Sequence, residues 1–306
     1  MVKKKTLLIL LFFLLIPAIF NACIQLREST SALQDKFPDA RVELMQEREN
    51  ALRYMSLHRN GTFPTIFFLH GSPSSLSVYN TYYSDNNLAC WANIITADRP
   101  GYGYSNPGKA EKSIVKQAEK MWKILEEEGY PSPLYLLGSS YGGSVAVKMA
   151  MMKPEKVSGI ILVSASMAPG MEKTYAISHV FKYKAFSWML PAMLRTANEE
   201  KLSHYEALTE ILPHWHKIIA PVILFQGTED DLIYPENVNF ARKKLKNSVY
   251  VELHLLKGEG HFLQLKYKDL ILIRLKSLID SVQIKNHLNA SIGEMTEKFN
   301  LKTSLP

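Results

Sequence analysis

Short apolar runs alternate with helix-like segments along most of this chain. The runs have the length and content of buried strands and occur at residues 65–69 (TIFFL), 93–97 (NIITA), 134–137 (LYLL), 157–163 (VSGIILV), 222–226 (VILFQ) and 249–256 (VYVELHLL). Helical patterns lie at residues 111–128, 140–152, 235–246 and 262–284. Strands that alternate with helices favour a mostly parallel sheet with helices on both faces. The sequence therefore predicts the α/β fold class.

Three segments depart from this alternation. Residues 52–59 alternate and precede Asn60-Gly61, which favours a hairpin leading into the run at residues 65–69. Residues 165–219 are rich in Met, Trp, Tyr and Phe and have no strand-like run, so we expect a helical cap at about 167–219 over one end of the sheet. Residues 285–306 are polar, which predicts a loose C-terminal tail.

The amino terminus has the parts of a signal peptide. A basic start (MVKKK) precedes an apolar core at residues 6–20, and Ala22 precedes Cys23. A small residue before a cysteine resembles the lipobox of bacterial lipoproteins, which implies removal of residues 1–22 and lipidation of Cys23. Phe20 stands where that motif usually has an aliphatic residue, and the alternatives are an uncleaved anchor or an ordinary secretory cleavage.

The segment after the signal peptide is expected to connect an anchor to the fold. Residues 23–50 are polar and lack clear periodicity, as in a linker, so we place the folded domain at residues 51–284. The chain has two cysteines, and a lipid on Cys23 leaves Cys90 without a partner, as a small buried hydrophobe. The net charge of +7 is spread along the chain, which does not favour nucleic-acid binding.

The segment LLGSSYGG ends one apolar run and contains two serines. Only Ser140 has glycines two positions before and two positions after it, Gly138 and Gly142. These glycines allow a sharp turn from a strand into a helix and close packing of that helix on the sheet. The same positions around Ser139 hold a leucine and a tyrosine, which do not accept positive φ cheaply. Ser140 is therefore the candidate nucleophile, and Ser139 is the spacer.

A nucleophilic serine needs a base, a group that orients the base, and donors for the oxyanion. In a parallel sheet, the loops after the strands supply such groups at one edge. The loop after residues 222–226 contains Asp230 and Asp231, and the loop after residues 249–256 contains His261. The chain order Ser, Asp, His is one of the known orders of a catalytic triad.

Five motifs occur in sequence: HGSP at residues 70–73, DRPGYGYS at 98–105, GSSYGG at 138–143, GTEDDLIYP at 227–235 and GEGHF at 258–262. Together they resemble the motifs of the α/β-hydrolase superfamily, in its branch of esterases, epoxide hydrolases and dehalogenases. The resemblance implies the α/β-hydrolase fold, with Ser140 as nucleophile and His261 as base. It also implies an oxyanion hole made by the backbone N–H groups of Ser72 and Tyr141, and it requires no cofactor or metal.

The resemblance leaves two candidates for the acid. Counting forward from Gly227 selects Asp230, and counting back from Pro235 selects Asp231. We take Asp230, because GTEDDLIYPEN fits the pattern with one additional residue before the proline. Members of the superfamily with an aspartate nucleophile open epoxides or displace halide, whereas a serine at that position implies acyl chemistry.

Other polar residues of these motifs are expected to have structural roles. His70, in a turn after a buried run, is expected to hydrogen-bond its own loop. Asp98 and Arg99 are expected to pair with each other or to hold their turn. His214 and His216 have no cluster of cysteines or carboxylates near them in sequence, so no metal site is predicted.

The sequence thus predicts a serine hydrolase, a carboxylesterase or lipase-like enzyme, anchored by a lipid in the cell envelope, or secreted or periplasmic. The composition of the cap suggests a small-molecule acyl substrate that is apolar. One alternative is an aminopeptidase or amidase, in which cap glutamates would bind the substrate's amino terminus: Glu199, Glu200, Glu206 and Glu210. The other is a non-catalytic lipoprotein that keeps the fold for binding. An intact set of Ser, Asp and His speaks against it.

Overall fold

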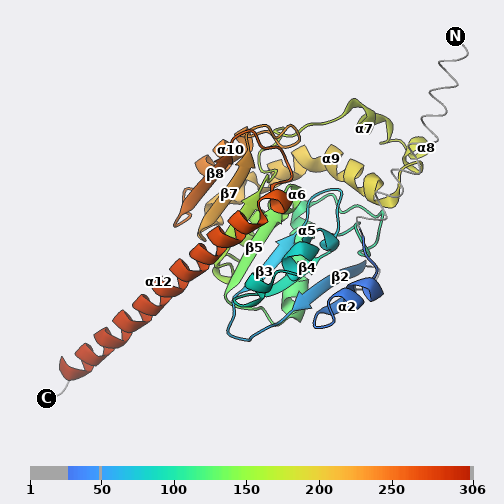
Figure 1. Cartoon of the computed structure of the whole chain (residues 1–306). Coiled ribbons are helices and arrows are strands. Elements are labelled where there is room, and N and C mark those ends of the chain that lie inside the picture. Colours follow the sequence, from blue (N-terminus) through green and yellow to red (C-terminus); the bar gives the residue numbers. More distant parts are fainter. Residues whose placement is uncertain (1–26, 48–49, 304–306) are drawn as a thin grey trace, which may run out of the picture.

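The computed structural model describes residues 27–47 and 50–303 of the chain (Figure 1). The expected signal peptide at residues 1–22 and the expected lipidation site at Cys23 lie outside these residues.

One eight-stranded sheet forms the centre of the molecule, in the order β1-β2-β4-β3-β5-β6-β7-β8. Its strands are β1 (Arg41–Glu47), β2 (Asn50–Leu57), β3 (Thr65–Leu69), β4 (Asn93–Ala97), β5 (Leu134–Ser139), β6 (Gly159–Val163), β7 (Val222–Gly227) and β8 (Val251–Leu256). β2 is antiparallel to both of its neighbours, and every pair from β4 to β8 is parallel. The expected α/β class is confirmed.

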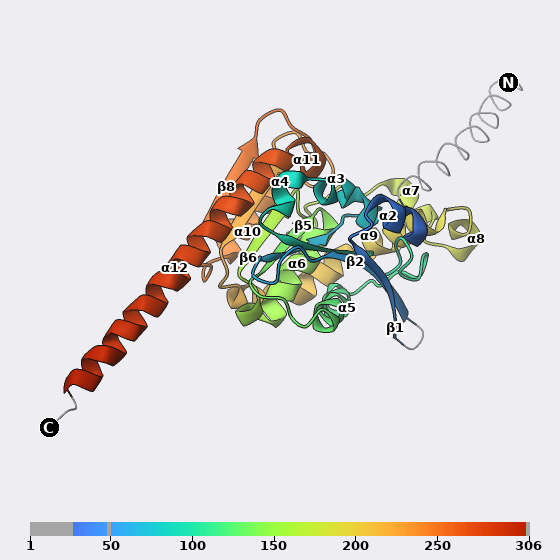
Figure 2. The ribbon, with the colours of Figure 1, turned by 60° about the horizontal axis from the view of Figure 1, so that its bottom comes forward.

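Helices cover both faces of this sheet (Figures 1 and 2). One face carries α2 (Thr30–Lys36), η1 (Leu76–Tyr79), α3 (Asn80–Tyr83), α4 (Asn86–Ala89), α11 (Leu263–Lys266) and α12 (Lys268–Thr303), and the other carries α5 (Ile114–Glu127), α6 (Tyr141–Met152) and α10 (Glu236–Lys244). In β3, Phe67 and Leu69 join the core under α5 and α6, while Ile66 and Phe68 join the core under α12. A strand buried on both faces needs no polar positions, which explains its continuous apolar run.

The cap lies between β6 and β7. It contains α7 (Ala176–Val180), α8 (Lys184–Ser187), α9 (Ala192–Ile211) and the 3-10 helix η3 (Leu212–Lys217), all within the segment where we expected a helical cap. The buried residues of α9 recur along its whole length: Met193, Thr196, Glu200, His204, Ala207, Leu208 and Ile211. In α7 only Ser178 is buried. α9 is therefore the part of the cap that packs on the sheet, and α7 and α8 extend away from it (Figure 2).

The predicted linker at residues 23–50 is wrong from Ser29 onward. Ser29 caps α2 by accepting the N–H of Ala32 at 3.1 Å, and Leu33 of this helix is fully buried. β1 then pairs along its whole length with β2. An edge strand obtains its hydrogen bonds from its partner and needs little apolar periodicity of its own. The largely polar composition of this segment therefore gave no indication of β1.

The predicted hairpin from β2 to β3 is also wrong. The chain does turn after Asn60, whose carbonyl accepts the N–H of Phe63 at 3.1 Å. However, β4 lies between the two strands and pairs with β2 on one side and β3 on the other. The turn dipeptide indicated the reversal of the chain, but it could not indicate which strand would become the neighbour.

The C-terminal tail expected at residues 285–306 is helical as far as Thr303, as the continuation of α12. Buried side chains of α12 lie between Ile271 and Ile279, whereas Ile284 and Leu288 are exposed. No proline interrupts residues 268–303, so backbone hydrogen bonds can continue without contact to the core. In the part of the chain that the structure covers, no helix has both the length and the apolar character that crossing a bilayer requires.

Cys90 is exposed, which contradicts the prediction of a buried residue. It follows the short helix α4, and its thiol donates to the carbonyl of Asn86 at 3.2 Å. Leu88 fills the core position of that helix instead.

Candidate active site

Ser140 occupies the turn between β5 and α6. Its backbone has φ 53° and ψ −124°, a conformation that a non-glycine residue adopts at a cost. The turn is held from both sides, because Ser140 N–H donates to Val163 O at 3.0 Å and Ser140 O accepts the N–H of Ser166 at 3.1 Å. A strained serine between a strand and a helix is the geometry of a nucleophile elbow.

The glycines around Ser140 allow neighbouring backbone segments to pack closely against the turn. Their own φ values are not positive. A Cβ on Gly142 would lie 2.1 Å from Leu69 O, and a Cβ on Gly138 would lie 2.6 Å from Gly142 O. A Cβ on Gly71 would lie 2.9 Å from Ser140 Cβ, so the loop after β3 runs directly against the serine. The positive φ of this turn belongs to Ser140 itself, which the sequence argument had assigned to its neighbours.

Ser139 has a structural role. It is the last residue of β5, it is buried, and its hydroxyl hydrogen-bonds the hydroxyl of Tyr79 at 2.9 Å. Ser140 is partly exposed. The structure therefore distinguishes the two serines as the sequence argument does.

Asp230, and not Asp231, is the partner of His261. His261 Nδ1 lies 2.8 Å from Asp230 Oδ2. The other oxygen of Asp230 accepts the N–H groups of Leu232 at 3.0 Å and Ile233 at 2.9 Å. Asp231 is exposed and pairs with Lys173, in the segment between β6 and α7. Of the two candidates for the acid, Asp230 is thus the one that contacts His261.

The environment of Asp230 keeps it ionised. Burial alone would raise the pKa of its carboxyl group, but the hydrogen bond from His261 and the two backbone N–H groups outweigh burial and lower the pKa below its usual value. An ionised carboxylate only accepts hydrogen bonds, so His261 Nδ1 carries the proton and Nε2 is the ring nitrogen available as a base.

The three candidate residues lie at the same edge of the sheet. Ser140 follows β5, Asp230 follows β7 and His261 follows β8, and these strands are parallel. The loop of His261 bends over the end of β7, because Glu229 N–H donates to Glu259 O at 2.9 Å. Among the described residues no hydrogen bond joins Ser140 to His261, as is common where the substrate is absent.

Of the two expected oxyanion donors, Tyr141 follows Ser140 in the chain, and Ser72 belongs to the loop that runs against Ser140. Tyr141 is the first residue of α6, so no carbonyl within that helix can accept its N–H. Ser72 follows Gly71, which touches Ser140, and the Ser72 hydroxyl hydrogen-bonds the hydroxyl of Tyr102 at 2.6 Å.

His70 hydrogen-bonds its own loop, as expected. Its Nδ1 donates to Gly71 O at 2.7 Å, and its Nε2 accepts the N–H of Arg99 at 2.9 Å. Burial, with the nearby Arg99 charge, lowers the pKa of His70 well below its usual value, so the ring stays neutral. It is not a second base.

Asp98 and Arg99 do not pair with each other, which corrects one of the two expectations for them. Asp98 pairs with Arg53 at 2.7 Å, and both side chains are fully buried. Arg99 pairs with Glu200 of α9 at 2.7 Å, and these side chains are also fully buried. Neighbours along the chain at the end of a strand point in different directions, so each acid or base here found a partner far away in sequence.

Arg99 connects the cap to the loop that carries Ser72, a connection that the sequence argument missed. Its guanidinium donates to Gly71 O at 3.1 Å, and its Nε donates to His70 O at 2.8 Å. Glu200 also accepts the hydroxyl of Tyr102 at 2.5 Å. The sequence of α9 did indicate that Glu200 would be buried, because Glu200 lies on the same face of the helix as the apolar residues that become buried.

A second buried polar cluster joins the cap to the segment after Ser140. His204 Nε2 lies 2.9 Å from Ser166 Oγ, which donates to Glu172 at 3.0 Å. The ring of His204 also stacks on Tyr141, with centroids 4.4 Å apart. Within the described residues, no group of three or more His, Cys, Asp or Glu side chains is placed to hold a metal ion.

A family model described as "alpha/beta hydrolase fold" matches residues 64–196. A curated relative, the pimeloyl-[acyl-carrier protein] methyl ester esterase of Aeromonas hydrophila, is 33% identical over 113 residues, which cover 37% of this chain and 42% of that protein. The alignments with the first curated relatives cover between 30% and 47% of their own length.

Two solved structures share the architecture. A bacterial membrane phospholipase A superposes with a TM-score of 0.61 at 20% identity, covering 92% of this chain and 99% of that one. A haloalkane dehalogenase from Bradyrhizobium elkani superposes with a TM-score of 0.64 at 17% identity, covering 80% and 99%. Their names belong to different enzymes, so a likeness at this level of identity concerns the fold alone.

Proposed function

We propose that this chain, which has the α/β-hydrolase fold, is a serine hydrolase that cleaves carboxylic esters through an acyl-enzyme. The observation that carries the proposal is the hydrogen bond from His261 to a buried, ionised Asp230 at the edge where Ser140 occupies its strained turn. A histidine fixed in this way has one free nitrogen with which to accept a proton.

In the proposed reaction, Ser140 Oγ attacks the ester carbonyl while His261 Nε2 takes the hydroxyl proton. The N–H groups of Ser72 and Tyr141 stabilise the negative oxygen of the tetrahedral intermediate. His261 then gives the proton to the departing alcohol, which leaves Ser140 as an ester of the acyl group. Water repeats the sequence with His261 as base, releases the carboxylic acid and restores the serine.

Ester cleavage is favoured over amide cleavage at an amino terminus by the state of the cap glutamates. Glu200 is fully buried and neutralised by Arg99, and Glu199 pairs with Lys112 at 3.1 Å. Glu206 and Glu210 are exposed. A substrate ammonium group would therefore find no unpaired, buried carboxylate among these four residues.

The apolar cap supports a substrate with an apolar acyl part, and the ester substrate named for the relative from Aeromonas hydrophila agrees with this class.

The first experiment is labelling of the full chain with a fluorophosphonate probe. We expect labelling to be lost in Ser140→Ala and His261→Ala and to be kept in Ser139→Ala. Asp230→Asn should reduce labelling strongly, while Asp231→Asn serves as its matched control and should label like the parent.

Hydrolysis of a graded series of p-nitrophenyl esters then tests the substrate class. Release of amine from aminoacyl naphthylamides, without ester cleavage, would replace the esterase by an amidase. A well-folded parent that no serine reagent labels would overturn catalysis and favour the binding protein.

Removal of residues 1–22 and lipidation of Cys23, with placement in the cell envelope, also belong to the proposal. Metabolic labelling with a fatty-acid analogue should mark the parent and fail to mark Cys23→Ala. Equal labelling of the two would contradict a lipid at this residue.

A further inference from the structure

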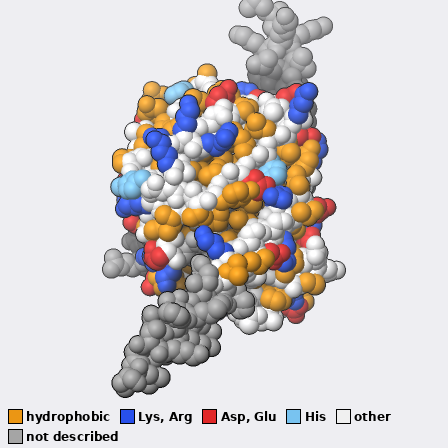
Figure 3. Space-filling view, turned by 90° about the vertical axis from the view of Figure 1, so that its left-hand side faces the viewer, with side chains coloured by type: hydrophobic (Ala, Val, Ile, Leu, Met, Phe, Trp, Pro, Cys, Tyr) orange, Lys and Arg blue, Asp and Glu red, His pale blue; other side chains and the backbone are white. Residues whose placement is uncertain are grey.

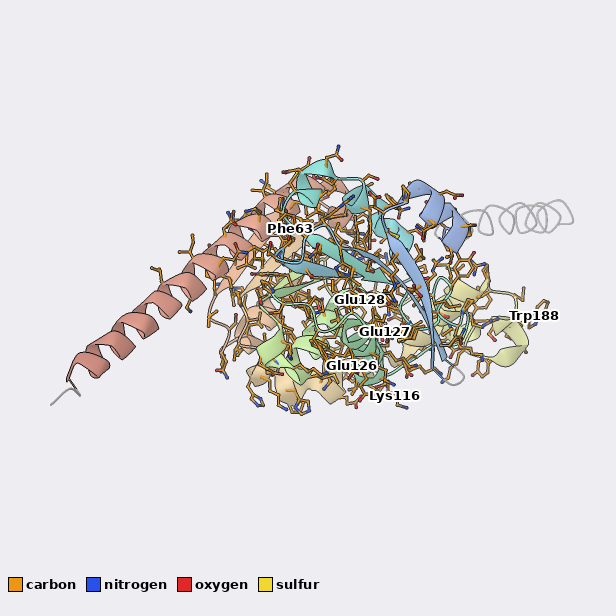
Figure 4. The ribbon with its side chains drawn as sticks, turned by 90° about the horizontal axis from the view of Figure 1, so that it is seen from below. Phe63, Lys116, Glu126, Glu127, Glu128 and Trp188 are labelled. Carbon is orange, nitrogen blue, oxygen red and sulfur yellow. The ribbon has the colours of Figure 1, made fainter. Side chains whose placement is uncertain are left out.

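The outer part of the cap exposes an unusual set of large apolar side chains. The α7–α8 face consists of Ile177, Val180, Tyr183, Phe186 and Trp188, with exposed fractions of 56%, 43%, 64%, 45% and 72%. Trp188 extends from the tip of the cap into solvent (Figure 4). Monomeric proteins in water seldom leave such a group uncovered, and an exposed apolar patch of this kind usually marks an interaction site.

Residues 173–198 contain Lys173, Lys182, Lys184 and Arg195 but no acidic residue. Lys173 pairs with Asp231, so Lys182, Lys184 and Arg195 give the segment its net positive charge. Tryptophan and tyrosine rings beside basic side chains are the composition of a surface that lies in the interface of an anionic bilayer.

The described chain begins beside this part of the cap. Arg27 donates to Gly103 O at 3.2 Å, and its guanidinium lies over the ring of Tyr104 at 4.6 Å. The same loop touches the start of α9, because a Cβ on Gly108 would lie 2.4 Å from Arg195 and 3.2 Å from Ala192. α8 precedes α9 by only a few residues. The sequence immediately before Arg27 includes the apolar run at residues 6–20.

We propose that the α7–α8 face docks on a lipid bilayer that contains anionic headgroups. The rings of Tyr183, Phe186 and Trp188 enter the interface, and the exposed Lys182 remains at the headgroups. The other strongly apolar surface is a poorer candidate, because apolar side chains around β8 and α12 are interspersed with both positive and negative charges (Figure 3). This proposal does not rest on the proposed activity.

Trp188 is a native probe for this contact. The chain has four tryptophans, of which Trp122 and Trp215 are buried and Trp91 is half-buried. The full chain is reconstituted into vesicles of phosphatidylcholine and phosphatidylglycerol, with or without lipids brominated at shallow acyl positions. We expect bromine to quench tryptophan emission by about a third or more, and Trp188→Phe to remove most of that quenching.

A matched pair of variants locates the contact. Ile177→Ser with Phe186→Ser should lower the bromine quenching at least twofold, because both side chains belong to the α7–α8 face. Val249→Ser changes a residue of similar exposure, 65%, that precedes β8, and it should leave the quenching unchanged. Unfolding temperatures of the variants in detergent confirm that each is folded.

Two results would overturn the proposal. In the first, Trp188 stays as accessible to aqueous acrylamide in vesicles as in detergent. In the second, it is shielded from acrylamide without quenching by bromine, which would indicate that a second copy covers the face. Neither readout uses catalysis, so a failure of the esterase proposal would leave this result intact.

Discussion

Arg99 is a buried cation whose hydrogen bonds extend to both sides of the active site. Its guanidinium holds two carbonyls of the loop that precedes Ser72 and is held in turn by Glu200 of the cap. Glu200 is therefore a positioning residue in our view: it acts on the oxyanion loop through Arg99 without touching the substrate.

Replacing Glu200 tests this positioning role. Glu200→Gln leaves the buried Arg99 without its counter-charge, which should cost about 3 kcal/mol of unfolding free energy. Where the variant is still folded, kcat on a p-nitrophenyl ester should fall about tenfold or more with little change in KM. Glu199→Gln removes a half-exposed pair and should change unfolding free energy by less than about 0.5 kcal/mol. Equal effects of the two changes on kcat would contradict the role.

His204 gives the protein an acid sensitivity at the residue scale. Burial, followed by repulsion from Lys201 and Arg99, lowers the pKa of His204 to about 3. The unfolded chain takes up this proton near its ordinary pKa of about 6.5. The stability contributed by the neutral ring is thus complete above about pH 6.5 and falls by about 1.4 kcal/mol per pH unit below it.

Urea unfolding of the parent and His204→Gln between pH 7 and pH 5 measures this effect. The variant should lose about 1.4 kcal/mol per pH unit less stability than the parent over the acid part of this range. Some acid dependence should remain, because the pKa of His70 is also lowered well below its usual value by burial. Identical slopes for the two proteins would exclude His204 as the source.

At this scale the candidates Ser140, His261 and Asp230 could be named from the sequence, because each stands in a short motif directly after a strand. It did not predict that Asp98 and Arg99 would find separate partners. Arg53 and Glu200 lie in an early strand and in the cap, and only the folded arrangement brings them to the same loop.

Among the elements, α6 depends most on a missing side chain. Its second residue, Gly142, lies so close to the end of β3 that a Cβ would be 2.1 Å from the carbonyl oxygen of Leu69. The three nearest atoms all belong to the backbone of Leu69 and His70, so none of them can move aside easily. The packing of the helix that begins at the nucleophile therefore rests on this contact.

Gly142→Ala should lower the unfolding free energy by about 3 kcal/mol, because the overlap must be relieved by displacing α6 from the sheet. Gly61 is the matched control, since its Cβ would meet no atom within 4 Å. Gly61→Ala should change stability by less than about 0.5 kcal/mol. Chemical denaturation of both variants provides the comparison, and a Gly142→Ala protein as stable as the control would contradict it.

Elements with a strong pattern of their own were predicted, and elements stabilised by a partner were not. The buried runs of β3 to β7 carry their apolar content in the sequence. β1 mixes polar with apolar residues and lacks a continuous apolar run, and it forms because β2 supplies its hydrogen bonds. The position of β4 between β2 and β3 likewise depends on sheet topology, which no turn dipeptide encodes.

At the scale of the molecule, α12 divides into a part that completes the core and a part that does not. Its first turns bury Ile271, Leu275 and Ile279 against the sheet. Farther along, Ile284 and Leu288 are exposed, and the helix projects away from the rest of the protein (Figure 1).

Two truncations should separate these parts. A chain that ends at residue 285 should fold with an unfolding free energy within about 1 kcal/mol of the parent, a change of ~3 °C in Tm. A chain that ends at residue 268 loses the five buried apolar side chains of α12, Ile271, Leu272, Leu275, Leu278 and Ile279, each worth several kcal/mol, and should not fold. Circular dichroism with thermal melting distinguishes the outcomes; a longer truncation that folds normally would contradict the division.

The architecture of the whole molecule was predictable because strand and helix patterns alternate over most of its length. The length of α12 was not predictable. The part of a helix that leaves the core has no apolar stripe in its sequence, and it requires only that no helix-breaking residue interrupts it. The position of the cap could be predicted because its sequence has no strand-like run. The orientation of its helices could not be predicted from the sequence.

The buried pair of Arg99 with Glu200, which holds α9 on the sheet, limits how the cap can open to admit a substrate. Separating this helix from the sheet would strand Arg99 without a counter-charge, so the cap cannot swing away as one rigid piece. We expect any movement of the cap to involve α7 and α8, because α7 buries only Ser178 and both helices precede α9, which begins after Pro191. A substrate that enters through this part of the cap would pass the same face that we propose to dock on the bilayer.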